Sequence, residues 1–390
     1  MAGKSHPAFK RARLETSKTN RVQRIHAHLF NHKELVCKAL EQLESDWAGF
    51  CFVKILFCNA DKSCSFDRAY CETRRNVQEN DADKRRVIWI PDLFSVSTVQ
   101  GFLDNYEGIG DQLLHKHLTA FEKLAKFLDT ISDTNKVLHK QLRDESLEEG
   151  QWATIFATHV IRKLAVYSEM IVDSSSSGVT LDSSSSDLAE CPCECKTVIK
   201  IGDNSMGHEN VWHGSVSIVL GPRTASTPVS LDDYGFSEIC NSAFDFRSGE
   251  LEKSQNQYIS ESIIFAFAMR GRVVPLVAIS KTCFKIYMYN RVNDLLYEST
   301  TMPLFVESVD GRELNQTSLI FLWMVINQSY FFKGVQTSHV EFNYKANLQD
   351  FLGEKRDIYQ NHIQIGGLRH VGDRLVKFIA GMNKGKFLRF

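Results

Sequence analysis

The chain has 390 residues, of which 43% are hydrophobic and 24% charged, values ordinary for a globular protein with a substantial core. This length favours two domains, and the formal net charge of −1 excludes a global field that recruits polyanions. Basic residues gather at the two ends instead, with seven Lys/Arg against Glu15 over Lys4–Arg24 and six against Asp373 over Arg369–Arg389. Such ends are typical of solvated tails or of segments that bind DNA or RNA.

The cysteines and the apolar runs indicate the compartment. Ten cysteines are spread along the chain without a disulfide framework, and the polar, basic N-terminus has no apolar signal segment. We therefore expect an intracellular protein, nuclear or cytoplasmic, and Lys10-Arg-Ala-Arg13 is a basic run of the kind found in nuclear-import signals. The longest apolar run, Leu319–Ile326, is far shorter than the ~20 residues that a membrane helix needs, so no membrane partner is expected.

The first part of the chain is predicted to be mainly helical. Residues 1–25 lack apolar periodicity and are predicted to form a disordered basic tail. Residues 26–140 combine helical spacing with a short strand element. The elements expected there are helices over His32–Asp46 and Asp111–Ser132 and strands over Phe50–Cys58 and Arg86–Pro91.

A third helix and a polar insert follow. Apolar spacing predicts a helix over Leu147–Ile171, with His159 on its apolar stripe as a packed histidine at the edge of the core. Residues 173–190 include two runs of four serines and are predicted to form a mobile loop, because they bury too little apolar surface. Cys191-Pro-Cys193-Glu-Cys195 comes next. It lacks a second ligand pair at a workable distance, so free thiols are predicted rather than a metal site.

The stretch Val211–Ser299 has the order strand, strand, buried helix, strand, strand. Lys196–Ile201 alternates and is predicted to form a hairpin with Val211–Leu220. Thr317–Phe332 is expected to be a helix that closes the core, and Val335–Tyr344 a strand. A sheet covered on both sides, with a crossover helix, produces this order, so the fold class expected is α/β or α+β.

Short motifs in the same stretch suggest a family. Trp212-His213-Gly214-Ser215-Val216-Ser217 is followed by Glu238-Ile239-Cys240 and then by Gln257 at the start of a helix. This arrangement resembles the RecB-like branch of the PD-(D/E)XK nuclease superfamily over residues 145–300, with the helix around Glu149–Met170 as the leading helix.

The resemblance implies a division of the chain. It predicts a restriction-endonuclease-like mixed sheet flanked by helices over residues 145–345, preceded by the mainly helical region. Residues 346–390 would then form a basic C-terminal extension.

The resemblance also implies a site. In the family, an aspartate and a glutamate on adjacent strands hold Mg²⁺, which activates a water, and a lysine assists. Here Ser217 stands in place of the aspartate and Cys240 in place of the lysine, while Glu238 remains as the metal ligand. Gln257 and His213 complete the candidate catalytic set. A serine hydroxyl is a poor ligand for Mg²⁺ and a thiol is too soft.

Three functions therefore remain open. The resemblance with two replaced residues favours a degenerate, inactive nuclease-like protein that binds nucleic acid through its basic ends. The second is an active nuclease with a rearranged site, Mg²⁺ being required only in that case. Its further groups would come from Glu148 or Glu149 or from the loops, namely Asp203, Asp232, Asp233, Glu252 and Lys253. The third is a protein-interaction module without a nucleic-acid role, in which Trp212 and Val216 are core residues and His213 is structural.

Overall fold

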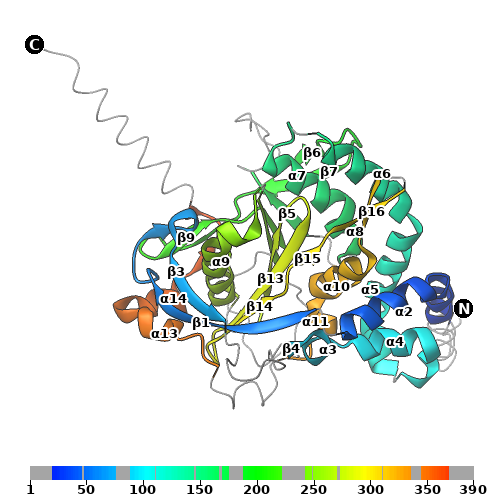
Figure 1. Cartoon of the computed structure of the whole chain (residues 1–390), viewed down its shortest axis with the longest axis horizontal. Coiled ribbons are helices and arrows are strands. Elements are labelled where there is room, and N and C mark those ends of the chain that lie inside the picture. The colour runs from blue at the N-terminus through cyan, green and yellow to red at the C-terminus, as the bar shows by residue number, and fades with distance from the viewer. Residues whose placement is uncertain are drawn as a thin grey trace, which may run out of the picture.

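The computed structural model describes residues 20–45, 48–75, 88–109, 111–144, 146–166, 169–174, 188–221, 242–247, 249–269, 273–309, 311–334 and 344–368. Figure 1 shows a large twisted sheet with helices on both sides. Within these ranges, no helix combines the length and the apolar character needed to cross a membrane.

The main sheet has twelve strands. In order across the sheet they are β3 (Cys71–Arg75), β1 (Gly49–Cys58), β14 (Leu295–Ser299), β13 (Cys283–Asn290), β12 (Pro275–Ile279), β11 (Ser242–Phe246), β10 (Ile218–Leu220), β5 (Met170–Asp173), β7 (Val198–Gly202) and β6 (Leu188–Glu190), while β4 (Ile88–Trp89) pairs with β1 and β15 (Met302–Pro303) with β13. The β11–β12 and β5–β7 pairs are parallel and the others antiparallel. The sheet is therefore mixed, as predicted.

Two smaller sheets and the helices complete the molecule. The small sheets are β16 (Phe305–Ser308) with β17 (Gly311–Leu314), and β18 (Gln364–Ile365), β8 (Ser205–Gly207), β9 (Trp212–Ser215) and β2 (Cys64–Ser65). The helices are 20–30, α2 (Lys33–Glu44), α3 (Ile90–Leu93), α4 (Val96–Asn105), α5 (Asp111–Asp129), α6 (Ile131–Leu142), α7 (Glu149–Phe156), α8 (Arg162–Leu164), α9 (Gln255–Ala268), α10 (Gln316–Ile326), α11 (Gln328–Phe331), α13 (Leu348–Phe351) and α14 (Arg356–Asn361). A π-helical turn, Ala157–Ile161, joins α7 to α8.

The central strands are buried on both faces. In β12, Val277 and Ile279 belong to the core that contains α10, whereas Leu276 and Ala278 belong to the core that contains α9. We call these two sides of the sheet the α10 face and the α9 face (Figure 1). Because side chains alternate between the faces of a strand, such double burial explains the near-continuous apolar sequence of β12.

Helices α9 and α10 are buried almost all round for the same reason. Helix α9 packs on β12 and β13 with one side and on β8 and β9 with another, and α10 packs against α2. A helix that is apolar on all sides requires such a second cover. The runs Ile263–Ala268 and Leu319–Ile326 supply these apolar surfaces.

The predicted hairpin of Lys196–Ile201 with Val211–Leu220 is wrong. Strand β7 pairs with β5 and β6 in the main sheet, and Val211–Leu220 is divided between β9 in a small sheet and β10 in the main sheet. The chain changes sheets at Val216, whose N–H donates to the carbonyl of Asn204. Alternation in the sequence fits two short strands as well as one long strand, so it does not locate this break.

The predicted boundaries also shift. Residues 20–25 belong to the helix 20–30 rather than to a disordered tail, because Ile25 and Leu29 are buried in the α10-face core. The division near residue 145 crosses the main sheet, because β1 pairs with β14. Part of the predicted C-terminal extension is folded, with Leu352 and Tyr359 buried on the α9 face.

Other predicted segments lie outside the described residues. These are 1–19, 175–187 of the serine-rich loop, 335–343 of the predicted strand, and 369–390.

Gly214 on β9 approaches an aromatic ring too closely for any side chain. A Cβ atom added there would lie 2.5 Å from Cδ2 of Phe66, a buried residue in the 3₁₀ helix Phe66–Arg68. We expect Gly214→Ala to lower the free energy of unfolding by about 1–3 kcal/mol, the usual range for overpacking. Gly249→Ala is the control, because a Cβ atom there meets nothing within 4 Å. Urea unfolding measures both, and equal losses would contradict the role assigned to Phe66.

Candidate functional site

A cluster of polar side chains lies on the α9 face at the end of β11. Asp245 and Arg247 alternate with Phe244 and Phe246, which are buried on the α10 face. Because side chains two residues apart point to the same side of a strand, Asp245 and Arg247 are brought together. The Arg247 Nε donates to Asp245 Oδ2 over 2.9 Å.

Two neighbouring elements add contacts to this pair. Glu149, in the first turn of α7, accepts a hydrogen bond from Arg247 Nη1 at 3.2 Å. Ser217, just before β10, donates through Oγ to Asp245 Oδ1 at 3.2 Å and accepts from the N–H of Phe246 at 3.1 Å. The backbone of β11 therefore holds the serine in place, and the serine hydroxyl is the hydrogen-bond donor to the second carboxylate oxygen of Asp245.

Helix α9 supplies the remaining side chains. Gln257 and Glu261 are one turn apart on its buried side, and Gln257 Nε2 donates to Glu261 Oε1 at 2.7 Å and lies 3.5 Å from Asp245 Oδ2. Glu261 is fully buried, and its Oε2 has no hydrogen-bond partner within the described part of the chain. We call these six residues, Glu149, Ser217, Asp245, Arg247, Gln257 and Glu261, the Asp245 cluster.

Burial dominates the electrostatics of this cluster. It raises the pKa of Asp245 to about 6, against the lowering effect of Arg247, and the negative charge of Glu149 adds to the increase. Burial and the neighbouring Asp245 together raise the pKa of Glu261 well above its usual value. One guanidinium is thus the counter-charge for three carboxyl groups, two of them buried. Because negative charge is in excess, the site favours bound protons or an added cation.

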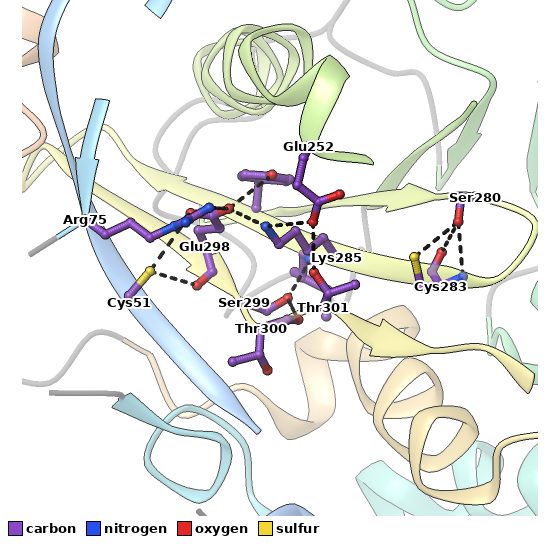
Figure 2. Close-up of polar contacts among 12 residues, drawn as sticks. Cys51, Arg75, Glu252, Ser280, Cys283, Lys285, Glu298, Ser299, Thr300 and Thr301 are labelled. Atoms are coloured by element: carbon purple, nitrogen blue, oxygen red, sulfur yellow. Dashed lines mark hydrogen bonds and ion pairs between the residues drawn. The ribbon is translucent and has the colours of Figure 1, made fainter. Parts of the chain in front are cut away.

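A second buried carboxylate in the same sheet shows the opposite balance. Glu298 on β14 accepts two hydrogen bonds from Arg75 on β3, at 2.7 and 2.9 Å, and one from Lys285 on β13 at 2.7 Å (Figure 2). Burial acts to raise the pKa of Glu298, but Arg75 and Lys285 outweigh it, and the pKa lies below its usual value. Cys51, whose Sγ lies 3.6 Å from the Glu298 carbonyl, completes this side of the network. We regard this fully paired group as structural.

The structure brings together two of the five residues predicted for the site, Ser217 and Gln257. His213 lies on β9 in a small sheet, and its Nδ1 is 2.8 Å from the carbonyl oxygen of Val211. Glu238 and Cys240 lie outside the described residues. Trp212 is fully buried and donates through Nε1 to Asn59 Oδ1, a core contact.

The carboxylate and the cation next to Ser217 are Asp245 and Arg247, which the sequence motifs did not predict. The strand that pairs with β10 and precedes α9 is β11, which begins at Ser242 and carries Asp245 and Arg247. The spacing of Asp245-Phe-Arg247, an acid and a cation two residues apart just before the helix of Gln257, is the sequence signal for them. Glu261 follows Gln257 by one helical turn.

Asp245 and Glu149 offer the hard oxygen ligands that Mg²⁺ prefers. Both accept hydrogen bonds from Arg247, so a metal ion at this point must displace the guanidinium. Comparison of the chain with family models, curated proteins and solved structures finds no match.

The raised pKa of Asp245 predicts a pH-dependent stability. In the unfolded chain an aspartate ionises near pH 4, whereas in the folded chain Asp245 does so near pH 6. Between these values the folded state binds more protons, so its stability falls as the pH rises. Relative to Asp245→Asn, the wild-type free energy of unfolding should drop by on the order of 2 kcal/mol from pH 4 to pH 7. Denaturant titrations at several pH values test this, and a flat or rising difference would refute it.

Glu298 predicts the opposite trend. Glu298→Gln leaves buried Lys285 with only the exposed Glu252, 3.9 Å away, as a counter-charge, and we expect a loss of about 3–5 kcal/mol at neutral pH. Because the folded-state pKa of Glu298 is lowered, its contribution is present above the unfolded value and is lost as the pH falls below about 4. Glu307→Gln, in an exposed pair with Arg312, is the control and should change stability by less than about 1 kcal/mol. Similar losses for both variants would contradict this assignment.

Proposed function

We propose that the chain is a degenerate PD-(D/E)XK nuclease-like protein, in which Arg247 takes the position of the catalytic metal ion. The proposal includes a restriction-endonuclease-like fold for the part of the chain from α7 to β14. Its expected ligand is DNA or RNA.

The order of the elements supports the proposal. The resemblance expects a leading helix, a strand ending in an aspartate, a strand with an acid-x-cation motif and a helix opening with glutamine. Helix α7, β10, β11 and α9 follow in this order, with Glu149, Asp245-x-Arg247 and Gln257 at the corresponding places, whereas Ser217 lies just before β10 rather than at its end. This alignment is an alternative to the one through Glu238 and Cys240, which lie outside the described residues.

The hydrogen bonds of Asp245 are the observation that carries the inactive assignment. Ser217 and Arg247 donate to its two carboxylate oxygens, and Arg247 also binds Glu149. A serine hydroxyl in place of a carboxylate removes one negative charge, and a fixed guanidinium supplies the positive charge that a metal ion would bring. The arrangement keeps one positive charge where the metal ion would lie but lacks the metal-bound water that attacks a phosphate.

A cleavage assay tests the proposal. Purified protein is incubated with single- and double-stranded DNA and RNA in Mg²⁺ or Mn²⁺, beside Asp245→Asn. We expect no metal-dependent cleavage above the level of the variant. The double variant Ser217→Asp/Arg247→Lys, which recreates the family pattern, is the positive arm and should gain activity. Cleavage by the wild type that Asp245→Asn abolishes would refute the inactive assignment.

That outcome would instead support the second candidate, an active nuclease with a rearranged site. The observation that favours it is the excess of carboxylates over cations, together with the unpartnered Oε2 of buried Glu261. In this case Glu149, Asp245 and Glu261 are the groups to hold Mg²⁺ once Arg247 moves aside.

Nucleic-acid binding is tested separately. Binding through the basic ends should weaken steeply with salt, because each neutralised phosphate releases counterions. Replacing Lys10, Arg11 and Arg13 by Ala should reduce both the affinity and the slope of its dependence on salt. Absence of binding at low salt to every probe would favour the protein-interaction module.

A further inference from the structure

Cys191, Cys193 and Cys195, which were predicted from the sequence to be free thiols, lie beside His159 on a helix about thirty residues earlier in the chain. His159 Nε2 is 3.0 Å from Cys193 Sγ and 4.0 Å from Cys191 Sγ, and the two sulfur atoms are 3.3 Å apart. With Cys195 included, the four ligand atoms all lie within 4.8 Å of one another. The histidine therefore provides the fourth ligand that the spacing of the cysteines did not reveal.

These separations fit one tetrahedral ion. Zinc binds cysteine sulfur at about 2.3 Å and histidine nitrogen at about 2.0–2.1 Å, so neighbouring ligand atoms around it are about 3.4–3.8 Å apart. The observed separations lie on both sides of this range, and small side-chain rotations bring the four atoms to it. Three thiolates and an imidazole form a soft ligand set, which selects zinc and excludes Mg²⁺ or Ca²⁺.

The backbone on both sides is shaped to present these side chains. His159 lies in the middle of the π-helical turn Ala157–Ile161, and such turns occur often at functional sites. The cysteines lie in the tight loop between β6 and β7, which the N–H of Cys191 closes by donating to the carbonyl of Thr197 at 2.9 Å. Glu194 and Lys196 in this loop have φ values of 66° and 60°, a left-handed conformation uncommon for residues other than glycine.

Cys191 and Cys193 contact the α10-face core, and exposed Cys195 is the ligand that core packing does not explain. His159 and Cys191 are buried, Cys193 is half-buried and Cys195 is exposed. The cluster thus has one buried side and one side open to solvent, from which an ion enters. Cys195 contributes little to a hydrophobic core at that position, although its sulfur faces the other three ligands.

We propose that His159, Cys191, Cys193 and Cys195 bind one structural Zn²⁺ ion. On binding, the three thiols release their protons to solvent and the imidazole coordinates in its neutral form, so no redox partner is needed. The ion joins the loop between β6 and β7 to the helix that begins at Glu149. None of the four proposed zinc ligands belongs to the Asp245 cluster, although Glu149 and His159 lie on the same helix. The zinc assignment therefore does not depend on whether the chain is a nuclease.

Metal analysis of the full-length chain tests the assignment. Protein purified without chelator should contain about one zinc per chain, because four protein ligands complete one structural site. Replacement of zinc by Co²⁺ should give the intense visible absorption of a tetrahedral thiolate site. Cys193→Ser and His159→Ala should lose the bound metal and the Co²⁺ spectrum. Cys37→Ser is the matched control, since Cys37 is also half-buried but lies on α2, and it should retain both.

Several outcomes would overturn the assignment. They are a wild-type chain that neither contains zinc nor takes it up after reduction, variants that bind as much zinc as the wild type, and a disulfide between two of the three cysteines in protein kept under reducing conditions. If the variants fail to fold, the Co²⁺ spectrum of the wild type decides, because an octahedral spectrum without thiolate bands is incompatible with this ligand set.

Discussion

Burial of the central strands on both faces is the constraint on which the rest of the structure depends. Strands β11 to β14, between α9 and α10, are buried along almost their whole length, so a charged side chain there must find its counter-charge within the protein. The sheet meets this requirement at two places in different ways. At Glu298, two cations satisfy one carboxylate. At Asp245, one guanidinium lies among three carboxyl groups. The remaining negative charge is neutralised by bound protons, and Gln257 and Ser217 donate hydrogen bonds to the carboxyl groups.

This difference separates a structural group from a candidate site. A buried charge that is fully paired is costly to disturb and has little left to offer a ligand. The Asp245 cluster retains an unpartnered carboxylate oxygen and a raised pKa, features that concentrate at functional sites. It lies where the end of β11 meets the first turn of α7, the first turns of α9 and Ser217 just before β10, and so draws side chains from four places in the chain.

The helix of α7, the π-helical turn and α8 connects the two clusters. Glu149 at its start contacts Arg247, and His159 ten residues later faces the three cysteines. An ion bound by His159 would fix the edge strand β6 and its neighbour β7 against this helix and so limit its movement. The position of Glu149 relative to Asp245 would then rest partly on the metal, a physical link between stability at the edge of the sheet and the geometry of the site.

Local pattern alone determined much of this protein. Apolar spacing located α2 and α5, and continuous apolar runs located α10, β1 and β12, because burial on one or on all sides fixes which residues must be apolar. The order of strands and helices gave a mixed α/β sheet, and Ser217 and Gln257 were identified from motifs that are local in sequence.

Tertiary structure decided which strands pair with each other and which side chains meet. The sequence does not show that Val211–Leu220 is divided between two sheets, since both halves alternate equally well. Nor does it show that β1 joins the sheet beside β14, more than two hundred residues away, or that Asp245 and Arg247 are the charged pair next to Ser217. His159 and the three cysteines look ordinary when considered separately. Only the fold packs a helix against a loop about thirty residues further along the chain and so brings their four side-chain nitrogen and sulfur atoms within 4.8 Å of one another. Side-chain chemistry is set locally, whereas coordination depends on distances in space.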